Sequence, residues 1–393
     1  MDATGVPAAW DAAKNVLCVR LDTIGDVLMT TPAIRALRAG SPGRRITLLT
    51  SPEGAAVARL VPEIDGVIEY AAPWVKGSPP APDQRGERRV IETLRGARFD
   101  AAAIFTVYTQ SALPAAMLCR LAGIPRSLAH CREQAYRLLT HRVPEDEPEH
   151  GVRHETQRQL DLVASIGCAA TDDRLSLAVP DAARSRIAAL LAGAGSGARP
   201  WAVVHPGATA ASRRYPPESF AAAADALVRE HGWRIVLAGG RGDAAAVAGV
   251  RRAMRARALD LSGRLTLAEL AALIEAAPVL IANNSAPVHV AAAVGTPVVD
   301  LYALTNPQHT PWRVPARVLY HDVPCRWCYR SVCPAGHHAC LREVSPADVV
   351  RATLELYAET QGLRDAHRRA DPDVPASGRA GGHTDVALRA RAG

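Results

Sequence analysis

Short apolar runs alternate with amphipathic segments along the first half of the chain. Val16–Arg20 is a largely apolar run of strand length, and a segment of helical period extends from about Asp26 to Arg38. Further strands are predicted at Ile46–Thr50 and Ala101–Val107, and residues 73–89, rich in proline, glycine and charge, are predicted to form a surface loop. Strands that alternate with helices in this way predict a parallel sheet covered by helices on both faces.

The same alternation restarts after a polar junction. Strands are predicted at Trp201–His205, Arg234–Ala238, Val279–Ala282 and Val298–Tyr302, with helices that open near Pro217, Thr266, Pro287 and Ser345. A chain of 393 residues is too long for one ordinary core. We therefore predict an α/β protein of two Rossmann-like domains, residues 1–178 and 179–363, followed by a disordered tail over residues 364–393.

The cations of the chain are almost all arginines. The formal net charge is +7 at pH 7, and Lys14 and Lys76 are the only lysines. Any anion-binding site must therefore use arginine, backbone N–H groups or helix N-termini. Because the basic residues are dispersed and no aromatic-rich strands accompany them, a non-enzymatic nucleic-acid-binding protein is the weaker alternative, and we expect no nucleic-acid partner.

The N-terminal segment has no export signature. Residues 1–15 contain three charged side chains and lack an apolar core of signal-peptide type. Residues 276–299 contain no charge, but prolines and a glycine interrupt them, so we expect no membrane-spanning helix there. We therefore expect a cytoplasmic protein with reduced cysteines.

The first strand leads through a glycine turn into a helix, from Arg20 to Val27. Asp26 falls at the start of that helix, where the helix dipole and free N–H groups stabilise an ionised carboxylate. Ligands of open α/β sheets bind beyond the carboxyl ends of strands, which is where this turn lies. Asp26 is therefore a candidate catalytic residue, although an acidic residue in a first helical turn is more often only a cap.

Three turns of the second half suit a nucleoside diphosphate. His205–Pro216 offers small residues and then two arginines before the next helix. Leu237–Asp243 is a strand, glycines and a helix, without the full spacing of the dinucleotide fingerprint. Ala282–Ala293 places small polar residues before a helix that carries His289, whose alternative role is core packing. The alternative for the first turn is an ordinary solvated loop.

Four cysteines lie close together near the end of the second half: Cys325, Cys328, Cys333 and Cys340. Cysteines this close in a reduced protein indicate a structural zinc site. The spacing matches no standard ribbon or finger, so free structural thiols stay equally open and a redox disulfide is the third alternative. Four protein ligands would leave no open coordination position, so such a zinc would take no part in catalysis.

Five segments resemble, in order, the motifs of glycosyltransferase family 9, the family of the ADP-heptose:lipopolysaccharide heptosyltransferases. They are RLDTIGDVLMTTPAIRAL, HPGATAASRRYPPESFA, VLAGGRGD, DLSGRLTLAEL and NNSAPVHVAAAVGTPVVDLY, and they extend over residues 16–305. The segment CRWCYRSVCPAGHHACLREVSP is also similar to a late segment of heptosyltransferase II-like members. The resemblance implies a GT-B fold, in which two Rossmann-like domains face each other across a cleft, with the acceptor side N-terminal and the donor side C-terminal.

The resemblance also implies roles for individual residues. Asp26 matches the aspartate proposed as the catalytic base, in a turn that includes the candidate substrate-binding residues Thr23 and Gly25. The other matches belong to the donor side, where they would bind the phosphates, the nucleoside or the sugar: Thr209, Arg213, Arg214, Gly240, Asp243, Asn284, Ser285, Ala286 and His289.

Three positions depart from the family pattern. Arg213 replaces a lysine, Asn284 replaces an aspartate and Ala286 replaces a glycine. Arg213 keeps the positive charge with a different geometry, whereas Asn284 is neutral and has hydrogen-bond donors of its own. These changes leave the donor sugar more open than the reaction class.

The resemblance implies an inverting, metal-independent transfer of a sugar, heptose from ADP-heptose, to a lipopolysaccharide core or related lipid-linked glycan. No cofactor is expected for catalysis, because arginines and N–H groups can supply the charge that a leaving diphosphate needs. Peripheral contact with the inner membrane is expected with such an acceptor. The alternative enzyme is a sugar-nucleotide 2-epimerase of the same fold, which the TIGD turn in the opposite half disfavours.

Overall fold

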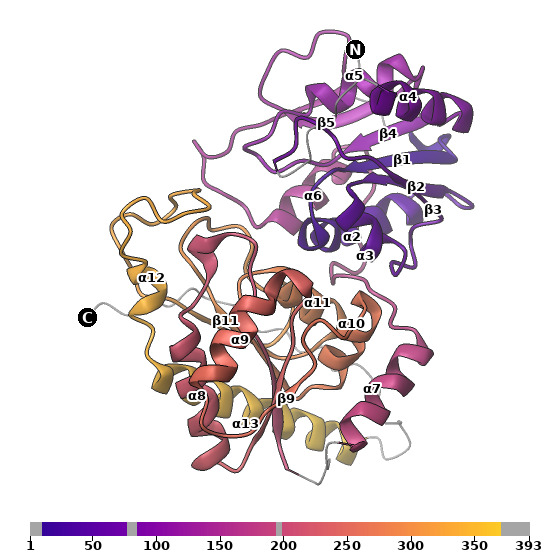
Figure 1. The fold of residues 1–393 in the computed structure, drawn as a ribbon. Coiled ribbons are helices and arrows are strands. Elements are labelled where there is room, and N and C mark those ends of the chain that lie inside the picture. The colour runs from indigo at the N-terminus through magenta and orange to yellow at the C-terminus, as the bar shows by residue number, and fades with distance from the viewer. Residues whose placement is uncertain (1–9, 77–84, 194–198, 371–393) are drawn as a thin grey trace. The chain divides into compact units, whose positions relative to one another are not determined.

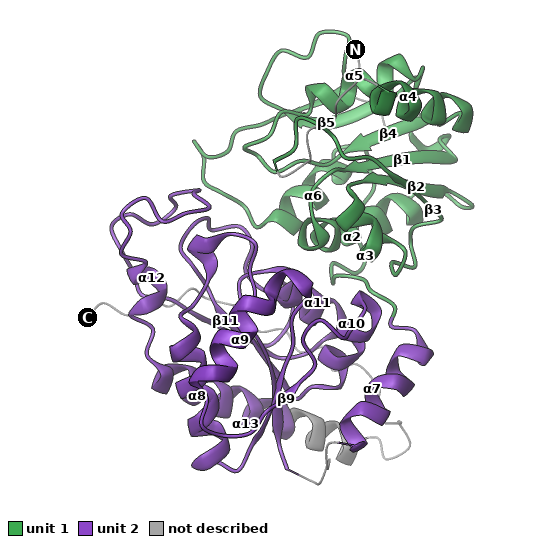
Figure 2. Ribbon diagram, in the orientation of Figure 1, with its two compact units in different colours: residues 1–178 green, residues 179–393 purple. Residues whose placement is uncertain are grey.

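Every strand in the described part of the chain pairs in parallel, and the strands form two separate six-stranded sheets (Figure 1). The computed structural model describes residues 10–76, 85–193 and 199–370, with side chains as far as residue 362. The chain divides into two units, residues 1–178 and 179–393 (Figure 2). The predicted α/β class, with the two Rossmann-like parallel sheets of a GT-B fold, is confirmed.

The first unit holds a sheet of strand order β3-β2-β1-β4-β5-β6. Its strands are β1 (Asn15–Arg20), β2 (Arg45–Thr50), β3 (Gly66–Glu69), β4 (Ala101–Ile104), β5 (Ser127–Cys131) and β6 (His141–Pro144). Its helices are α2 (Ile24–Ala39), α3 (Pro52–Ala58), α4 (Arg85–Ala97), α5 (Leu113–Leu121) and α6 (Glu155–Ala164). Helices α2, α3 and α6 pack together on one face of the sheet, and α4 with α5 covers the other (Figure 1).

The second unit repeats the plan with the order β12-β11-β10-β7-β8-β9. Its strands are β7 (Trp201–His205), β8 (Arg234–Leu237), β9 (Leu259–Asp260), β10 (Val279–Asn283), β11 (Val298–Leu301) and β12 (Ala316–Leu319). Its helices are α7 (Asp181–Gly193), α8 (Pro217–Arg229), α9 (Ala244–Ala253), α10 (Leu267–Ala276), α11 (Ala286–Val294), α12 (Ala339–Arg342) and α13 (Pro346–Ala370), with short 3₁₀ turns at Ala211–Arg213 and Arg241–Asp243. Helices α8, α9 and α13 form one covering layer, and α7, α10 and α11 form the other.

The central strands are apolar along their length because helices cover both of their faces. Leu17, Ile104 and Val204 are at most 1% exposed, and each buried aliphatic side chain of this size contributes about 1.5–3 kcal/mol to folding. The predicted start of α10 near Thr266 is confirmed by a capping box, in which the Thr266 hydroxyl accepts from the Glu269 N–H at 3.3 Å and the Glu269 carboxylate accepts from the Thr266 N–H at 2.7 Å. Each half therefore has the core of an independent α/β unit.

Two predicted boundaries of the first unit are wrong. Helix α2 begins at Ile24, so Gly25 lies inside its first turn and not in the loop before it. Helix α4 begins at Arg85, within the segment predicted as a surface loop, because Val90 and Leu94 give it a buried face among many charged side chains. Residues 77–84 of that loop lie outside the described residues.

The predicted disordered tail begins too early. Helix α13 runs from Pro346 to Ala370 and so continues past residue 364. Arginine and alanine favour helix without producing an apolar stripe, which is why periodicity failed to indicate this extension. The rest of the predicted tail, residues 371–393, lies outside the described residues.

No helix in the described ranges is long and apolar enough to cross a membrane. The uncharged stretch over residues 276–299 is divided among the end of α10, strand β10, helix α11 and the start of β11.

Candidate active site

In the first unit the chain reverses direction across the sheet between β1 and β4, and such a switch point leaves a crevice at the carboxyl ends of the strands. Asp26 lies in the first turn of α2, directly after β1, and so at this edge of the sheet. The Asp26 carboxylate is partly exposed, at 17% of its side-chain surface, and its Oδ2 accepts from the Thr23 N–H at 3.1 Å and from the Thr23 hydroxyl at 2.9 Å. Thr23 is the exposed cap residue of α2, so the structure brings these two candidates together.

The other oxygen of Asp26 is held by a buried arginine. Arg20, at the end of β1, is 0% exposed, and its Nη2 donates to Asp26 Oδ1 at 3.0 Å. The same guanidinium forms ion pairs with Asp22 at 3.0 Å and with the buried Glu155 of α6 at 2.7 Å. Burial opposes the charge of Arg20, but the charges of Asp22, Glu155 and Asp26 outweigh it and raise the arginine pKa further. Arg20 therefore stays charged and fixes three carboxylates around one point.

The protonation of Asp22 is perturbed by its surroundings. Burial raises the pKa of Asp22 against the opposing charge of Arg20, and with the negative charges of Asp26 and Glu155 this pKa reaches about 6. Gln110, from the loop after β4, donates to Asp22 Oδ1 at 2.7 Å. Asp22 thus titrates close to neutrality beside Asp26.

Most of this cluster is not indicated by the sequence pattern. Asp22 and Arg20 belong to the first motif but carry no implied role there, and Glu155 and Gln110 are 135 and 88 residues away from their partners. The available signal was the order Arg-Leu-Asp immediately before the turn, since charged residues at the end of a buried strand need partners. Gly25 is buried in the first turn of α2, and its contact with a substrate stays a prediction.

In the second unit the corresponding switch point lies between β7 and β10. The loops after β7, β8 and β10 meet at this edge of the sheet. Asn283, the last residue of β10, accepts from the Tyr215 N–H at 2.9 Å and donates to the Pro206 carbonyl at 2.7 Å. Ser285 donates to the Gly207 carbonyl at 3.1 Å. These bonds hold the loop after β7 against the start of α11, so the candidates of the first and third predicted turns lie together.

The cationic candidates belong to the loop after β7. Arg213 is partly buried, and its Nε donates to the Thr305 hydroxyl at 3.3 Å. Arg214 is exposed and donates from Nε to the Ala208 carbonyl at 2.8 Å, with a longer contact to the carbonyl of the exposed Thr209 at 3.4 Å. Two guanidinium groups and a hydroxyl therefore share one short loop at the carboxyl edge of the sheet.

Asp243 packs against the same loop from the side of β8. Its Oδ2 accepts from the exposed Gly240 N–H at 2.9 Å and lies 3.7 Å from His205 Nε2. Burial lowers the pKa of His205, and the Asp243 charge opposes this shift. A Cβ atom on Gly207 would lie 2.1 Å from Asp243 Oδ1, so only glycine allows this close packing. Asp243 is thus at the predicted site, where it also supports the loop.

The helix-start candidates surround the N-terminus of α11. Ser285 caps the helix, Ala286 is its first residue, and both are partly exposed. Asn284 is 3% exposed, and its side chain donates to Asp300 of β11 at 3.1 Å and to the His309 carbonyl at 2.8 Å. His289 is 4% exposed, with its ring centroid 6.5 Å from that of His309.

Three of the four cysteines of the second unit lie close enough to Cys340 to affect its pKa. The charges of Cys333, Cys325 and Cys328 each raise the pKa of Cys340, after burial as the main cause. Cys325 Sγ lies 3.7 Å from His337 Nε2. In the part of the chain that the structure describes, however, no three histidine, cysteine or acidic side chains gather closely enough to hold a metal ion. The zinc site therefore stays a prediction from the spacing.

Metal analysis tests this prediction directly. If the cysteines form the site, the purified protein should contain about one zinc per chain by mass spectrometry, since four thiolates satisfy one tetrahedral ion. Cys325→Ser/Cys328→Ser should lose the zinc, whereas Cys119→Ser, which changes a buried cysteine of the first unit, should keep it. Equal zinc content in the two variants would assign the metal elsewhere.

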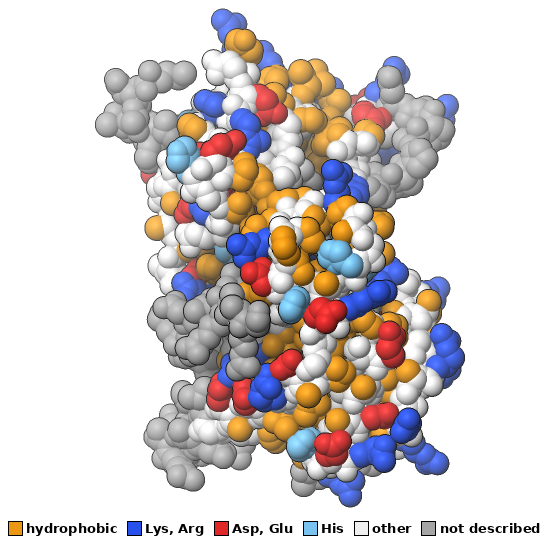
Figure 3. Space-filling view, turned by 90° about the vertical axis from the view of Figure 1, so that its left-hand side faces the viewer, with side chains coloured by type: hydrophobic (Ala, Val, Ile, Leu, Met, Phe, Trp, Pro, Cys, Tyr) orange, Lys and Arg blue, Asp and Glu red, His pale blue; other side chains and the backbone are white. Residues whose placement is uncertain are grey.

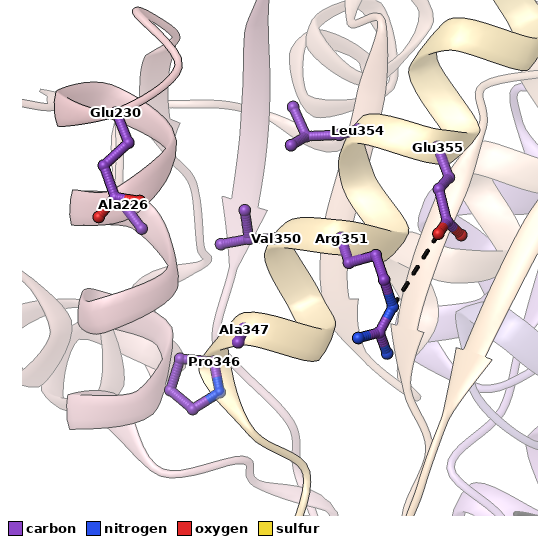
Figure 4. Close-up of a pocket in the computed structure, with 8 residues that line it drawn as sticks. All are labelled: Ala226, Glu230, Pro346, Ala347, Val350, Arg351, Leu354 and Glu355. Carbon is purple, nitrogen blue, oxygen red and sulfur yellow. Dashed lines mark ion pairs between the residues drawn. The ribbon is translucent and has the colours of Figure 1, made fainter.

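One surface pocket of the second unit lies away from these residues. A pocket of about 430 Å³ between α8 and α13 is lined by Ala226, Glu230, Pro346, Ala347, Val350, Arg351, Leu354 and Glu355 (Figure 4). Its one ion pair joins Arg351 and Glu355 on the same helix at 3.9 Å. None of the candidate residues lines it, so this pocket is not part of the candidate active site.

The close packing of the Asp243 carboxylate against Gly207 can be tested by substitution. Gly207→Ala should displace the Asp243 carboxylate and lower the free energy of unfolding by about 1–3 kcal/mol, the usual cost of overpacking. Gly242→Ala is the matched control, because a Cβ there meets nothing within 4 Å. Adding Asp243→Ala should recover part of the loss in Gly207→Ala, measured by chemical denaturation. Additive losses would show that Asp243 does not pack as described.

The comparisons with known proteins agree with this arrangement. The model of glycosyltransferase family 9 (heptosyltransferase) matches residues 87–339, more than half of the chain. Lipopolysaccharide heptosyltransferase 3 of Escherichia coli K12 is 28% identical over 357 residues, which cover 85% of this chain and 96% of the relative.

Solved structures show the same fold. The glycosyltransferase family 9 protein of Veillonella parvula superposes with a TM-score of 0.73 at 23% identity, over 88% of this chain and 98% of that one. The ADP-heptose lipopolysaccharide heptosyltransferase II of E. coli superposes with a TM-score of 0.69 at 22% identity, over 88% and 99%. The family match and the lipopolysaccharide heptosyltransferase relative favour a glycosyltransferase over the epimerase and nucleic-acid-binding alternatives. On the coloured part of the face in Figure 3, basic side chains are interspersed with acidic and apolar ones, which also disfavours a nucleic-acid-binding surface there. The chain is a member of glycosyltransferase family 9.

Proposed function

We propose that this enzyme transfers heptose from ADP-heptose to a lipopolysaccharide core acceptor, with inversion at the anomeric carbon. The observation that carries the proposal is the combination of family membership with a carboxylate, Asp26, fixed at the carboxyl edge of the first sheet. The similar proteins of known name are lipopolysaccharide heptosyltransferases, and one solved neighbour is named for ADP-heptose. The donor and acceptor are carried over from these names.

In the proposed reaction Asp26 accepts the proton of an acceptor hydroxyl as that oxygen attacks the anomeric carbon. A bond forms between the acceptor oxygen and this carbon, and the bond from the carbon to the diphosphate oxygen breaks, so ADP leaves. Arg20 and Thr23 orient the Asp26 carboxylate through the bonds described above. Orientation matters because a general base must lie within hydrogen-bond distance of the proton that it removes.

The leaving diphosphate would be stabilised by the loop after β7 and the start of α11. Arg213, Arg214 and the Thr209 hydroxyl supply donors from one short loop, and the N–H groups near Ser285 and Ala286 supply the positive end of a helix dipole. Such groups can replace a catalytic metal ion. Gly240 and Asp243 would contact the nucleoside, and Asn284 and His289 the donor sugar or its phosphate.

Substitution of the base tests the proposal. Asp26→Asn should lower kcat by about 10²–10⁴-fold, because the amide cannot accept the proton. The assay measures ADP release from ADP-heptose with a lipopolysaccharide core acceptor, and release of UDP or GDP from UDP- and GDP-sugars as control donors. Asp22→Asn is the matched variant in the same cluster and should alter the pH dependence near 6 while losing far less activity.

The outcomes separate the reaction from the residue. A larger loss in Asp22→Asn than in Asp26→Asn would move the base to Asp22. Wild-type protein that releases no ADP from ADP-heptose, with or without the acceptor, would refute the proposed donor.

We also propose that the first unit contacts an anionic membrane surface through the outer side of α5. Met117 and Leu121 lie one turn apart on this helix and are 43% and 51% exposed, and Tyr136 nearby in the chain is 84% exposed. Arg120 on the same helix is exposed and donates to the Arg137 carbonyl at 3.3 Å, which brings the two segments together. Exposed apolar side chains flanked by arginines suit a lipid headgroup boundary.

Three further arginines of the first unit are held against its backbone. Arg126, Arg132 and Arg142 each donate to backbone carbonyl groups of the first unit. Arg120 and Arg137 define the proposed surface instead, because Arg120 lies on α5 with Met117 and Leu121, and Arg137 follows Tyr136 in the chain.

Vesicle binding tests the membrane contact. Met117→Ser/Leu121→Ser should lower binding to phosphatidylglycerol-containing vesicles by about tenfold or more, since each buried apolar side chain contributes about 1.5–3 kcal/mol. Val332→Ser, which changes an apolar residue of the second unit that is 68% exposed, should leave binding unchanged. Equal binding of all three proteins in sedimentation would contradict the proposal.

A further inference from the structure

The side chains of Asn284 and Asp300 form a buried pair at the carboxyl edge of the second sheet. Asn284 follows β10 directly, and Asp300 lies in the neighbouring strand β11. Asn284 Nδ2 lies 3.1 Å from Asp300 Oδ2 and 2.8 Å from the His309 carbonyl oxygen. The two side chains are 3% and 0% exposed.

This environment fixes which way the Asn284 amide faces. A backbone carbonyl can only accept a hydrogen bond, and an ionised carboxylate also only accepts, so the atom that faces both must be the NH₂ group. Both N–H groups of the amide are then used within the protein. Among the residues that the structure describes, none donates to Asn284 Oδ1. The amide oxygen is therefore the group that Asn284 can offer to a ligand.

The contacts of Asp300 within the described chain leave one of its carboxylate oxygens without a hydrogen bond. It is fully buried in a strand whose neighbours are apolar, and its Oδ1 has no hydrogen-bond partner in the described chain. Burial raises the pKa of Asp300 to about 7, although the hydrogen bond from Asn284 and the charge of Arg213 oppose this shift. A buried acid with one unsatisfied oxygen lowers the free energy of unfolding. Its presence here therefore indicates a role other than stabilising the fold.

We propose that Asp300 is a positioning residue that holds Asn284 with its amide oxygen toward the donor, where this oxygen accepts a hydrogen bond from a sugar hydroxyl. The inference rests on the proposed function, in which Asn284 contacts the donor sugar. The family aspartate at this position would supply an acceptor oxygen directly. In this chain the negative charge belongs to Asp300 in the neighbouring strand β11, and it acts on the ligand through the Asn284 amide, whose oxygen is the acceptor.

The chemistry of the pair supports a hydroxyl as the partner. An ionised carboxylate that accepts from an amide N–H polarises the amide and makes its oxygen a stronger acceptor. An asparagine free to rotate could present either its NH₂ group or its oxygen. The pair with Asp300 removes the first choice, so the site selects a ligand group that donates.

Ligand titration calorimetry with ADP-heptose and with ADP alone tests the inference. Asp300→Ala should weaken ADP-heptose binding about tenfold more than ADP binding, the usual scale of one hydrogen bond, with ADP as the reference because Arg213, proposed to contact the diphosphate, also interacts with Asp300. Asn284→Asp alone should also weaken ADP-heptose binding, because two carboxylates then face each other across about 3 Å. Asn284→Asp/Asp300→Asn reverses the pair and should restore binding to within about threefold. Thermal denaturation of each variant, together with its ADP affinity, separates lost sugar contact from lost folding.

The pH dependence supplies a second readout. Above about pH 7 Asp300 is ionised and holds the amide; below it the carboxyl group is protonated, so the KM for ADP-heptose should rise as the pH falls. Arg213 and Tyr302 also lie in electrostatic contact with Asp300, and Asn284 contacts the backbone carbonyl of His309, whose ring centroid lies 6.5 Å from that of His289. Asp300→Asn keeps an acceptor oxygen but cannot ionise, so its KM should be independent of pH in this range, whereas a titrating histidine would leave the dependence in place.

The outcomes separate this inference from the proposed function. Wild-type protein that binds no ADP-heptose overturns both. Wild-type protein that binds ADP-heptose, with a reversed pair no better than Asn284→Asp or with an unchanged preference in Asp300→Ala, overturns the role of Asp300 alone.

Discussion

The burial of Arg20 is the interaction on which the first unit's site depends. A guanidinium removed from water costs several kcal/mol unless carboxylates and hydrogen bonds surround it, and here Asp22, Asp26 and Glu155 do so. The three partners come from the turn after β1, from α2 and from α6. The same contacts that compensate for the buried charge therefore tie the helices to the end of the central strand. They also orient Asp26 without any ligand, so the candidate base is held in place before a substrate arrives.

The second unit positions its loop without a buried arginine at the centre. Asn283 bridges a backbone N–H and a backbone carbonyl of the loop after β7, and Gly207 allows the Asp243 carboxylate to pack against that loop. The loop after β7 is thus positioned by side chains at or after the ends of β10 and β8, the two strands that flank β7 in the sheet. Arginines placed on such a loop can face an anion with little reorganisation, which is what stabilisation of a leaving diphosphate requires.

The sequence predicted the features that depend on neighbouring residues. Strands β1, β7 and β11, the α10 capping box and the α2 turn follow from apolar runs and cap residues within a few positions of one another. Strands β5 and β6 and helix α6 mix polar and apolar side chains, so their patterns gave no such signal. Glu155 was missed for the same reason: its importance arises only when the fold brings α6 beside β1.

The departure at Asn284 illustrates a further limit of arguing from sequence. As a substitution it removes a negative charge, and the sequence alone indicated a weaker acceptor with donors of its own. The structure shows that both donors are engaged by Asp300 and the His309 carbonyl. Asp300 was not singled out because an acidic residue in an apolar strand can only be interpreted once its neighbour in the adjacent strand is known. A change at one position can thus preserve the chemistry of a site when a second position, in contact with the first but 16 residues away, supplies the charge.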